Sequence, residues 1–346
     1  MDSLATVRCP DCGAEIAPGL LACPSCARLL HADHLKKLAG EADGAEQRGD
    51  LSAALGFWRE ALDLLPPDSR QHGVILQKVR TLSSQVEDLP SAAPQGNAWK
   101  KGAAGASGIA LLLFKFKSIL IFLLAKGKFL LLGLTKAKTL FSMLLFLGVY
   151  WSLWGWKFAL GFVVSIYVHE MGHVWMLNRY GIKATAPMFI PGFGALVRLQ
   201  QYPVTVIEDA RVGLAGPLWG LGAAAAAYAA YAVTEASIWG AIAQSGAMIN
   251  LFNLIPIWQL DGGRGLRSLT RVQRGLVALA AGVLYYATGH EHRQNVFLLI
   301  IAVCAGARAF VGEAPRHRDD FGLFEYVLLL MTLGALSAIS LPGVSS

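Results

Sequence analysis

The residues best equipped for chemistry are HEMGH, at positions 169–173. On a helix, residues four positions apart lie about 40° apart around the axis and one turn along it, so His169 and His173 can bind one metal ion. Glu170 is rotated roughly 100° from His169, near the metal without being a ligand. Zinc activates water for hydrolysis, and a neighbouring carboxylate takes the proton and passes it to the leaving amine. The motif predicts zinc-dependent hydrolysis with Glu170 as the general base.

An alternative interpretation is that both histidines are buried residues with local hydrogen bonds. Their setting argues against it, because the motif lies within an apolar segment long enough to cross a bilayer. Ionisable residues are costly there and usually functional. Three of them within five residues favour a metal site.

A zinc ion on two histidines needs a third protein ligand and an open position. Asp261 fits this role in the sequence NLIPIWQLDGGRG, residues 253–265. Asn253 and Pro256 interrupt an apolar segment, which membrane proteins tolerate beside a cavity or a site. Gly262 and Gly263 allow the chain to turn sharply and approach closely.

Other candidates for the third ligand are less favourable. Glu208 and Asp209 stand at the entrance of an apolar segment, where contact with headgroups or helix capping is expected. His290 and His292 are expected on the opposite membrane face.

The elements that must position these residues are membrane helices. Charged residues make up 15% of the chain, against ~25% in soluble proteins. Residues 1–100 resemble soluble sequence, and residues 139–341 contain repeated apolar runs; a bilayer helix needs about 20 such residues. We predict spans at about 139–156, 157–179, 209–233, 237–258, 275–289, 294–311 and 321–341. Residues 1–30 lack the apolar region of a signal peptide, so entry through the chain's own helices is expected.

The net charge of +7 is concentrated beside the apolar segments. Basic residues in that position mark the cytoplasmic side and contact anionic headgroups, so no nucleic-acid partner is expected. With the N-terminal head in the cytosol, the ends of the spans that carry His169 and Asp261 meet near the cytoplasmic face. These basic residues are Lys100, Lys101, Lys115, Lys117, Lys126, Lys128, Lys136, Lys138, Arg264, Arg267, Arg271 and Arg274.

Four of the five cysteines form two CxxC pairs, Cys9 with Cys12 and Cys23 with Cys26. In a cytosolic segment this pattern favours zinc over disulfides. Each CxxC turn directs two thiolates at one ion, so a structural zinc with four sulfur ligands is predicted in a zinc ribbon at residues 1–30.

Residues 31–88 have helical periodicity, and Pro66-Pro67 separates the last two helices. The stretch RGDLSAALGFWREALDLLPPD resembles a single tetratricopeptide-type unit, which cannot bury its apolar face alone and is expected to pack on the ribbon, on another subunit or on a partner. Residues 89–107 are a linker rich in proline and glycine. Residues 108–138 are apolar but carry lysines on no single helical face. They form either a membrane-surface or re-entrant segment or poor spans.

Three motifs together, HEMGH within a span, AGPLWG at 215–220 and NLIPIWQLDGG at 253–263, resemble the signatures of the site-2 protease family of intramembrane zinc metallopeptidases. The resemblance covers about residues 139–275. It implies a three-helix core with zinc on His169, His173 and Asp261 and with Glu170 as the base. It also implies regulated cleavage of transmembrane or membrane-proximal segments, with Asn253 orienting the substrate or stabilising the oxyanion.

The chain departs from this family in two ways. Many relatives place an asparagine after the GP motif, where this chain has Trp219-Gly220, so a polar contact is expected to be missing there. No inserted PDZ domain fits between the first two motifs and no CBS pair follows the core. Regulation is therefore expected through the N-terminal head.

Residues 182–199 contain β-favouring residues around Pro191, Gly192, Phe193 and Gly194. We expect a short hairpin whose edge, with Phe193 and Gly194, pairs with an unwound substrate strand and presents the scissile amide. The alternative is an ordinary loop between two spans.

The sequence thus predicts a mainly α protein, a polytopic membrane helical bundle with a three-helix metalloprotease core, a zinc ribbon and soluble helices. Residues 276–346 add further transmembrane helices. The expected function is zinc-dependent intramembrane proteolysis in a bacterial cell membrane, with one catalytic and one structural zinc. Expected partners are a membrane-protein substrate, the bilayer and a regulatory protein at the head. The alternative is an inactive scaffold or zinc sensor that recruits partners through the head.

Overall fold

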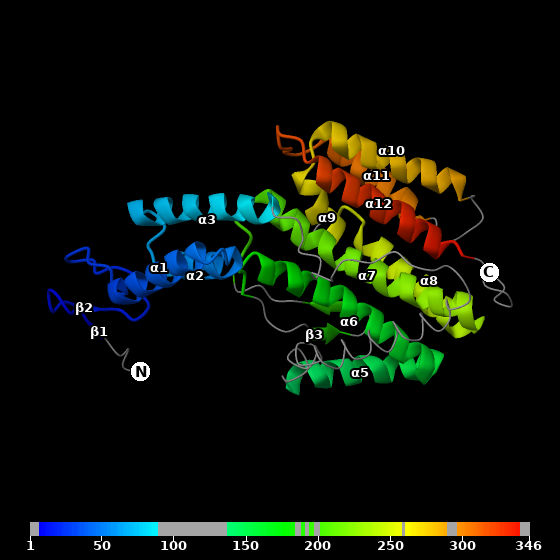
Figure 1. Cartoon of the computed structure of the whole chain (residues 1–346), viewed down its shortest axis with the longest axis horizontal. Helices are drawn as coiled ribbons and strands as arrows, with labels where there is room; N and C mark the ends of the chain where they lie inside the picture. The colour runs from blue at the N-terminus through cyan, green and yellow to red at the C-terminus, as the bar shows by residue number, and fades with distance from the viewer. Residues whose placement is uncertain are drawn as a thin grey trace, which may run out of the picture. The chain divides into compact units, whose positions relative to one another are not determined.

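The computed structural model is mainly α-helical and describes residues 7–88, 137–183, 188–190, 194–196, 201–257, 260–288 and 296–339 (Figure 1). The chain divides into two compact units. The first comprises Met1–Asp88, Ser165–Ala184 and Leu199–Ser346, and the second comprises Leu89–Val164 and Thr185–Arg198. The predicted linker at 89–107 and residues 108–136 lie outside the described part of the chain.

The first unit begins with a small β-structure and three helices. Strands β1 (Val7–Arg8) and β2 (Glu15–Ile16) pair antiparallel. Helices α1 (Ala32–Gln47), α2 (Leu51–Asp63) and α3 (Arg70–Asp88) follow, and α2 packs against both of the others. The Asp50 carboxylate starts α2 by accepting the Ala53 N–H, as an N-cap does. We call residues 7–88 the head.

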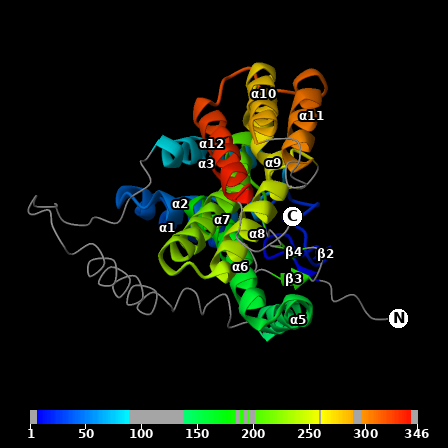
Figure 2. The same ribbon diagram turned by 90° about the vertical axis from the view of Figure 1, so that its right-hand side faces the viewer.

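The rest of the first unit is a bundle of apolar helices. It contains the second part of α6 (Trp156–Arg179), then α7 (Val206–Thr234) and α8 (Ser237–Asn253). The short helices α9 (Asp261–Gly265) and η1 (Leu266–Ser268) lead to α10 (Arg271–Ala287), α11 (Val296–Phe310) and α12 (Asp320–Ser337). Figures 1 and 2 both show α10, α11 and α12 side by side.

Helices α7 and α8 pack closely, as the small residues at 220–230 indicate. Ala224 is fully buried, and a Cβ on Gly246 would be in ordinary contact with it. The core of this bundle is formed by fully buried leucines that include Leu214, Leu251 and Leu254.

The second unit contains α5 (Ala137–Trp154), the start of α6, and strands β3 (Met188–Ile190) and β4 (Gly194–Leu196). The strands pair antiparallel with Phe189 opposite Ala195, which confirms the predicted hairpin. Phe193 at its turn lies outside the described residues. Trp151, Trp154 and Trp156 are more than half exposed around the α5–α6 turn, as an interfacial belt requires.

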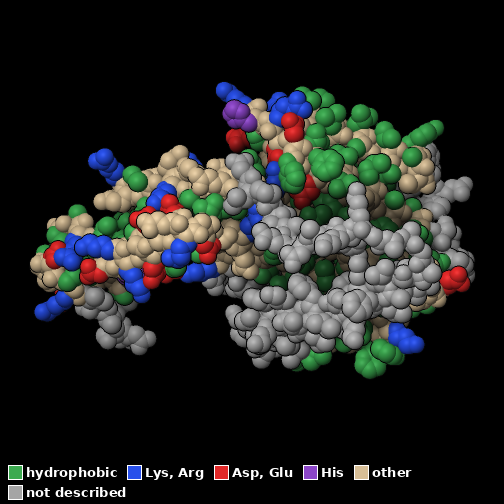
Figure 3. Space-filling view, in the orientation of Figure 1, with side chains coloured by type: hydrophobic (Ala, Val, Ile, Leu, Met, Phe, Trp, Pro, Cys, Tyr) green, Lys and Arg blue, Asp and Glu red, His purple; other side chains and the backbone are tan. Residues whose placement is uncertain are grey.

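A helix occupies each of the seven predicted spans, with ends that differ from the expected bounds by up to five residues. Within the described ranges, α6, α7 and α12 are long and apolar enough to cross a membrane, and Phe141–Trp154 and Val296–Phe310 are shorter apolar helices. In the view of Figure 3, charged side chains gather over α1–α3 and hydrophobic side chains cover α10–α12. The exposed side chains of α10–α12 include Leu279, Val303 and Phe324, each more than 60% accessible. Such a surface suits lipid rather than water.

Candidate metal centre

His169, His173 and Asp261 come together in the first unit. All three are buried, and one ligand atom from each lies within 4.8 Å of the others. The His169 and His173 Nε2 atoms are 3.2 Å apart. The Asp261 carboxylate oxygens lie 3.1 Å from His169 Nε2 and 3.4 Å from His173 Nε2. The structure thus joins the two halves of the predicted site, α6 and the start of α9.

These spacings suit a tetrahedral zinc ion. Zinc–nitrogen and zinc–oxygen bonds of about 2.0–2.1 Å place neighbouring tetrahedral ligands about 3.3 Å apart. The three measured separations bracket that value. Three protein ligands leave a fourth position for water or substrate, as catalytic zinc sites do.

The other ring nitrogen of each histidine is held by a hydrogen-bond partner. His173 Nδ1 lies 2.7 Å from the Val212 carbonyl oxygen, which can only accept, so Nδ1 carries the proton. His169 Nδ1 lies 2.7 Å from Asn250 Oδ1 on α8. Partners of this kind fix the tautomer and the ring plane of a metal-binding histidine and leave Nε2 free to ligate.

Gly216 in the AGPLWG motif makes room for the two imidazoles. A Cβ at this position would collide with the His173 ring and would lie 2.8 Å from His169 Nε2. The glycine therefore allows the α7 backbone to form one wall of the metal site.

Glu170 is buried beside the site, and its carboxylate is not part of the group of ligand atoms. This placement agrees with a role as a base rather than as a ligand. Asn253 Nδ2 lies 3.4 Å from His169 Nε2, so this amide also lies at the site.

The chain segment before Asp261 is held by α12. Tyr326 is fully buried and donates a 2.5 Å hydrogen bond from its hydroxyl to the Leu254 carbonyl. A Cβ at Gly262 would overlap that same carbonyl and lie 2.6 Å from the Tyr326 hydroxyl. A helix beyond the predicted 139–275 core therefore positions the third ligand.

Glu208 and Asp209, the competing acids, lie outside the metal group in the first turn of α7, where Glu208 Oε2 accepts the Val204 N–H at 2.8 Å, in line with the expected helix capping. Glu208 is fully buried and forms a 2.9 Å ion pair with Arg59 of the head. Asp209 pairs with Arg264 and Arg267. The sequence could not show these pairings because the partners are far apart along the chain.

Arg274 also departs from the membrane-surface position expected for it. Its side chain is buried and donates to the backbone carbonyls of Leu266 and Arg308. It links η1 to α11. His290 and His292 lie outside the described residues.

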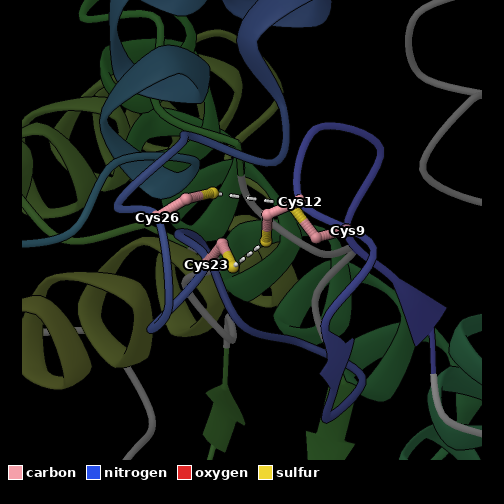
Figure 4. A group of neighbouring side chains, drawn as sticks. All are labelled: Cys9, Cys12, Cys23 and Cys26. Atoms are coloured by element: carbon pink, nitrogen blue, oxygen red, sulfur yellow. Dashed lines mark hydrogen bonds between the residues drawn. The ribbon is translucent and has the colours of Figure 1, made fainter.

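The four N-terminal cysteines form a second cluster that could hold a metal ion (Figure 4). The Cys9 and Cys26 sulfurs are 3.7 Å apart and those of Cys12 and Cys23 are 3.6 Å apart, so no disulfide is formed. Four sulfurs at about 2.3 Å from one zinc ion lie about 3.8 Å from each other. A hydrogen bond from the Cys26 backbone lowers the pKa of Cys23 to about 6, which favours its thiolate.

The head contacts the end of the helix that carries the histidines. Ser52 Oγ donates to the Arg179 carbonyl at 2.7 Å, and Arg59 Nε donates to the Tyr180 carbonyl at 3.0 Å. Gly181 has a φ of +64°, and a Cβ there would lie 2.5 Å from the Gly56 nitrogen. The α2 backbone thus lies directly against the turn that ends α6.

The fold and the two clusters define a membrane helical protein with two groups of residues that can bind metal, one of them containing the HExxH motif. Residues 157–236 match the model of peptidase family M50. The match includes both histidines and the AGPLWG motif and ends before Asp261, whose place in the site rests on the geometry above.

Two curated relatives carry zinc metalloprotease names. Zinc metalloprotease MJ0392 of Methanocaldococcus jannaschii is 29% identical over 127 residues, which are 35% of this chain and 36% of the relative. Probable zinc metalloprotease EGY2, chloroplastic, of Arabidopsis thaliana is 27% identical over 175 residues, which are 34% of this chain and 32% of the relative. The chain therefore spans about a third of the length of each. No solved structure matches the chain. These similarities support a metallopeptidase of the site-2 protease type.

Proposed function

We propose that this protein is an intramembrane zinc metalloprotease that hydrolyses peptide bonds in or near transmembrane segments of other proteins. The observation that carries the proposal is the convergence of His169, His173 and Asp261, with Glu170 buried beside them. Zinc bound there would supply Lewis acidity for amide hydrolysis. The inactive-scaffold alternative is not favoured, since the ligands and the base are all present.

The chain's own residues would divide the remaining tasks. Glu170 would accept a proton from the attacking water and deliver it to the departing amine. The Asn253 amide, which lies beside His169, would donate a hydrogen bond to the developing oxyanion or to the substrate backbone. The hairpin residues Phe193 and Gly194 remain proposed substrate contacts.

The surroundings of the site support a membrane-embedded substrate. Its histidines lie within α6, one of the helices long and apolar enough to span a bilayer. A transmembrane helix has its amides hydrogen-bonded internally, so it must unwind locally before hydrolysis.

The four-cysteine cluster is proposed to bind a second, structural zinc, because four thiolates leave no open position for a substrate. We also propose that helices α1–α3 have a tetratricopeptide-like character and bind a regulatory partner. The head is proposed to lie in the cytoplasm. The direct contacts of α2 with the end of α6 support the transmission of a regulatory signal from the head to the helix that carries the histidines.

Replacing Glu170 with glutamine tests the proposed reaction. The amide keeps the size of the side chain but cannot accept the proton, so turnover should fall by about 10²–10⁴-fold with the core zinc retained. The measurement is metal analysis of the purified protein together with cleavage of a membrane-protein substrate.

The same variant should trap uncut substrate. Photo-crosslinkers at Asn253, Phe193 and Gly194 would then test the proposed substrate contacts. Normal cleavage by Glu170→Gln would refute the general-base role, and a wild-type protein without core zinc would refute the metalloprotease.

A further inference from the structure

The space beside Gly220 is occupied by the side chain of Asn250, a residue that no sequence motif singled out. Asn250 lies on α8 and is fully buried. Its Nδ2 donates to the Gly246 carbonyl at 2.7 Å, one helical turn earlier. Its Oδ1 lies 2.7 Å from His169 Nδ1.

The Gly246 contact determines which way the Asn250 amide faces. Turned by 180°, the amide would place Oδ1 against the Gly246 carbonyl, and two acceptors would then meet in a buried site. Oδ1 therefore faces the imidazole. Since Oδ1 can only accept, His169 Nδ1 must carry the proton and Nε2 must present its lone pair to the metal position.

Gly220 on α7 provides the space that this amide occupies. A Cβ at position 220 would overlap Asn250 Oδ1 and lie 2.5 Å from Nδ2. Gly220 and Asn250 are therefore sterically coupled. Gly220 on α7 has no side chain, and the Asn250 amide on α8 fills the space that one would occupy. A polar side chain from another helix thus occupies the space beside position 220.

We propose that Asn250 is a positioning residue for His169, fixing its tautomer and ring plane for metal binding, and that Gly220 is the seat that admits the Asn250 amide. The inference rests on the metal-binding function proposed above. It identifies a residue needed for metal affinity that is not itself a ligand. Losing such a partner of a metal-binding histidine lowers affinity by about 10–100-fold.

Cobalt(II) titration of the full-length protein can measure this effect without relying on activity. Cobalt bound to four thiolates absorbs strongly by charge transfer, whereas cobalt on imidazole and carboxylate gives weaker ligand-field bands, so the two sites are distinguishable. Asn250→Ala should weaken binding at the core site about 10–100-fold and change its bands, and leave the thiolate site unaltered. Asn250→Asp, which can still accept from Nδ1, should retain more affinity than Asn250→Ala.

A matched pair on α7 tests the role of Gly220. Gly220→Ala should lower core-site affinity although Asn250 is intact, because its Cβ displaces the amide. Gly222→Ala should have no such effect, since nothing lies within 4 Å of a Cβ there. The double variant Gly220→Asn with Asn250→Ala returns an amide to the same space from α7 and should bind more tightly than Asn250→Ala alone.

Wild-type affinity and bands in Asn250→Ala would overturn the role of Asn250. A double variant no better than Asn250→Ala, or equal affinities in Gly220→Ala and Gly222→Ala, would overturn the role of Gly220. The failure of the proposed function would look different, because the wild-type chain itself would then bind cobalt only at the cysteines.

Discussion

At the scale of single residues, the geometry of the candidate metal site depends on the groups that contact its ligands. The histidines and Asp261 offer atoms 3.1–3.4 Å apart, and acceptors on other helices hold both Nδ1 atoms. The wall opposite them is backbone at Gly216. Hydrogen bonds from outside the ligand set therefore hold the candidate ligand atoms at separations that suit zinc, which reduces the reorganisation that binding requires.

Gly216→Ala should abolish zinc binding at the core site. The added methyl group would occupy the space of the His173 ring, and neither imidazole could keep its position. One zinc per chain should be lost by metal analysis, and cleavage should be lost with it. Gly222→Ala on the same helix is the control and should keep zinc and gain up to about 1 kcal/mol in helix stability. Full zinc content in Gly216→Ala would show that the site can relax.

Sequence and structure agree best at the candidate ligands, which the structure brings together. HEMGH and Asp261 could be recognised because few residue types bind zinc and because histidines four residues apart lie on the same face of a helix. Asn250 could not be recognised in this way, since an asparagine in an apolar helix has many possible partners. Its role appears only when α6, α7 and α8 are placed together.

At the scale of elements, the loop that brings Asp261 to the histidines depends on α8 and α12, two helices that are far apart in the sequence. Residues after Asn253 leave α8 and re-enter a helix at Asp261, and α12 reaches the loop through Tyr326. The sequence predicted the helix ends well because apolar runs mark them. It did not predict that α12 supports the third ligand, because a lipid-facing helix and a supporting helix have the same apolar composition.

Tyr326→Phe should destabilise this loop while leaving α12 folded. Removing the donor to a buried carbonyl costs about 1–3 kcal/mol. Core-site zinc affinity should fall with it, since Asp261 follows the loop directly. Thermal unfolding with and without added zinc measures both effects. Tyr202→Phe is the control because Tyr202 is 77% exposed. Equal behaviour of the two variants would show that the hydroxyl is dispensable.

At the scale of the whole molecule, the head is joined to the rest of the first unit by polar contacts between distant parts of the chain. The Arg59–Glu208 pair is almost inaccessible to solvent, and Lys183 pairs with Glu60 near the surface. The Lys183 hydrogen bond lowers the pKa of Glu60. The sequence indicated only that the head must bury an apolar face somewhere. It could not indicate where, because one unit of this kind has no repeat neighbours.

Arg59→Met should destabilise the protein by about 3–5 kcal/mol, because it leaves the Glu208 carboxylate buried without its partner. Arg59→Met combined with Glu208→Gln should recover part of that loss by removing the charge. Lys183→Met, at the exposed pair, should cost about 1 kcal/mol or less. Thermal unfolding and protease sensitivity provide the comparison. A loss in Arg59→Met no larger than in Lys183→Met would contradict the proposed joint.

The contacts of α2 with the turn after α6 also matter for any attempt to shorten the chain. The carbonyls of Arg179 and Tyr180, at the point where α6 ends, accept hydrogen bonds from Ser52 and Arg59. The head therefore completes the end of a helix whose last carbonyls lie more than a hundred residues further along the chain than Ser52 and Arg59. A protein trimmed to its membrane part would expose those carbonyls and leave the buried Glu208 carboxylate without its ion-pair partner. It would therefore differ in structure from the same region of the whole protein.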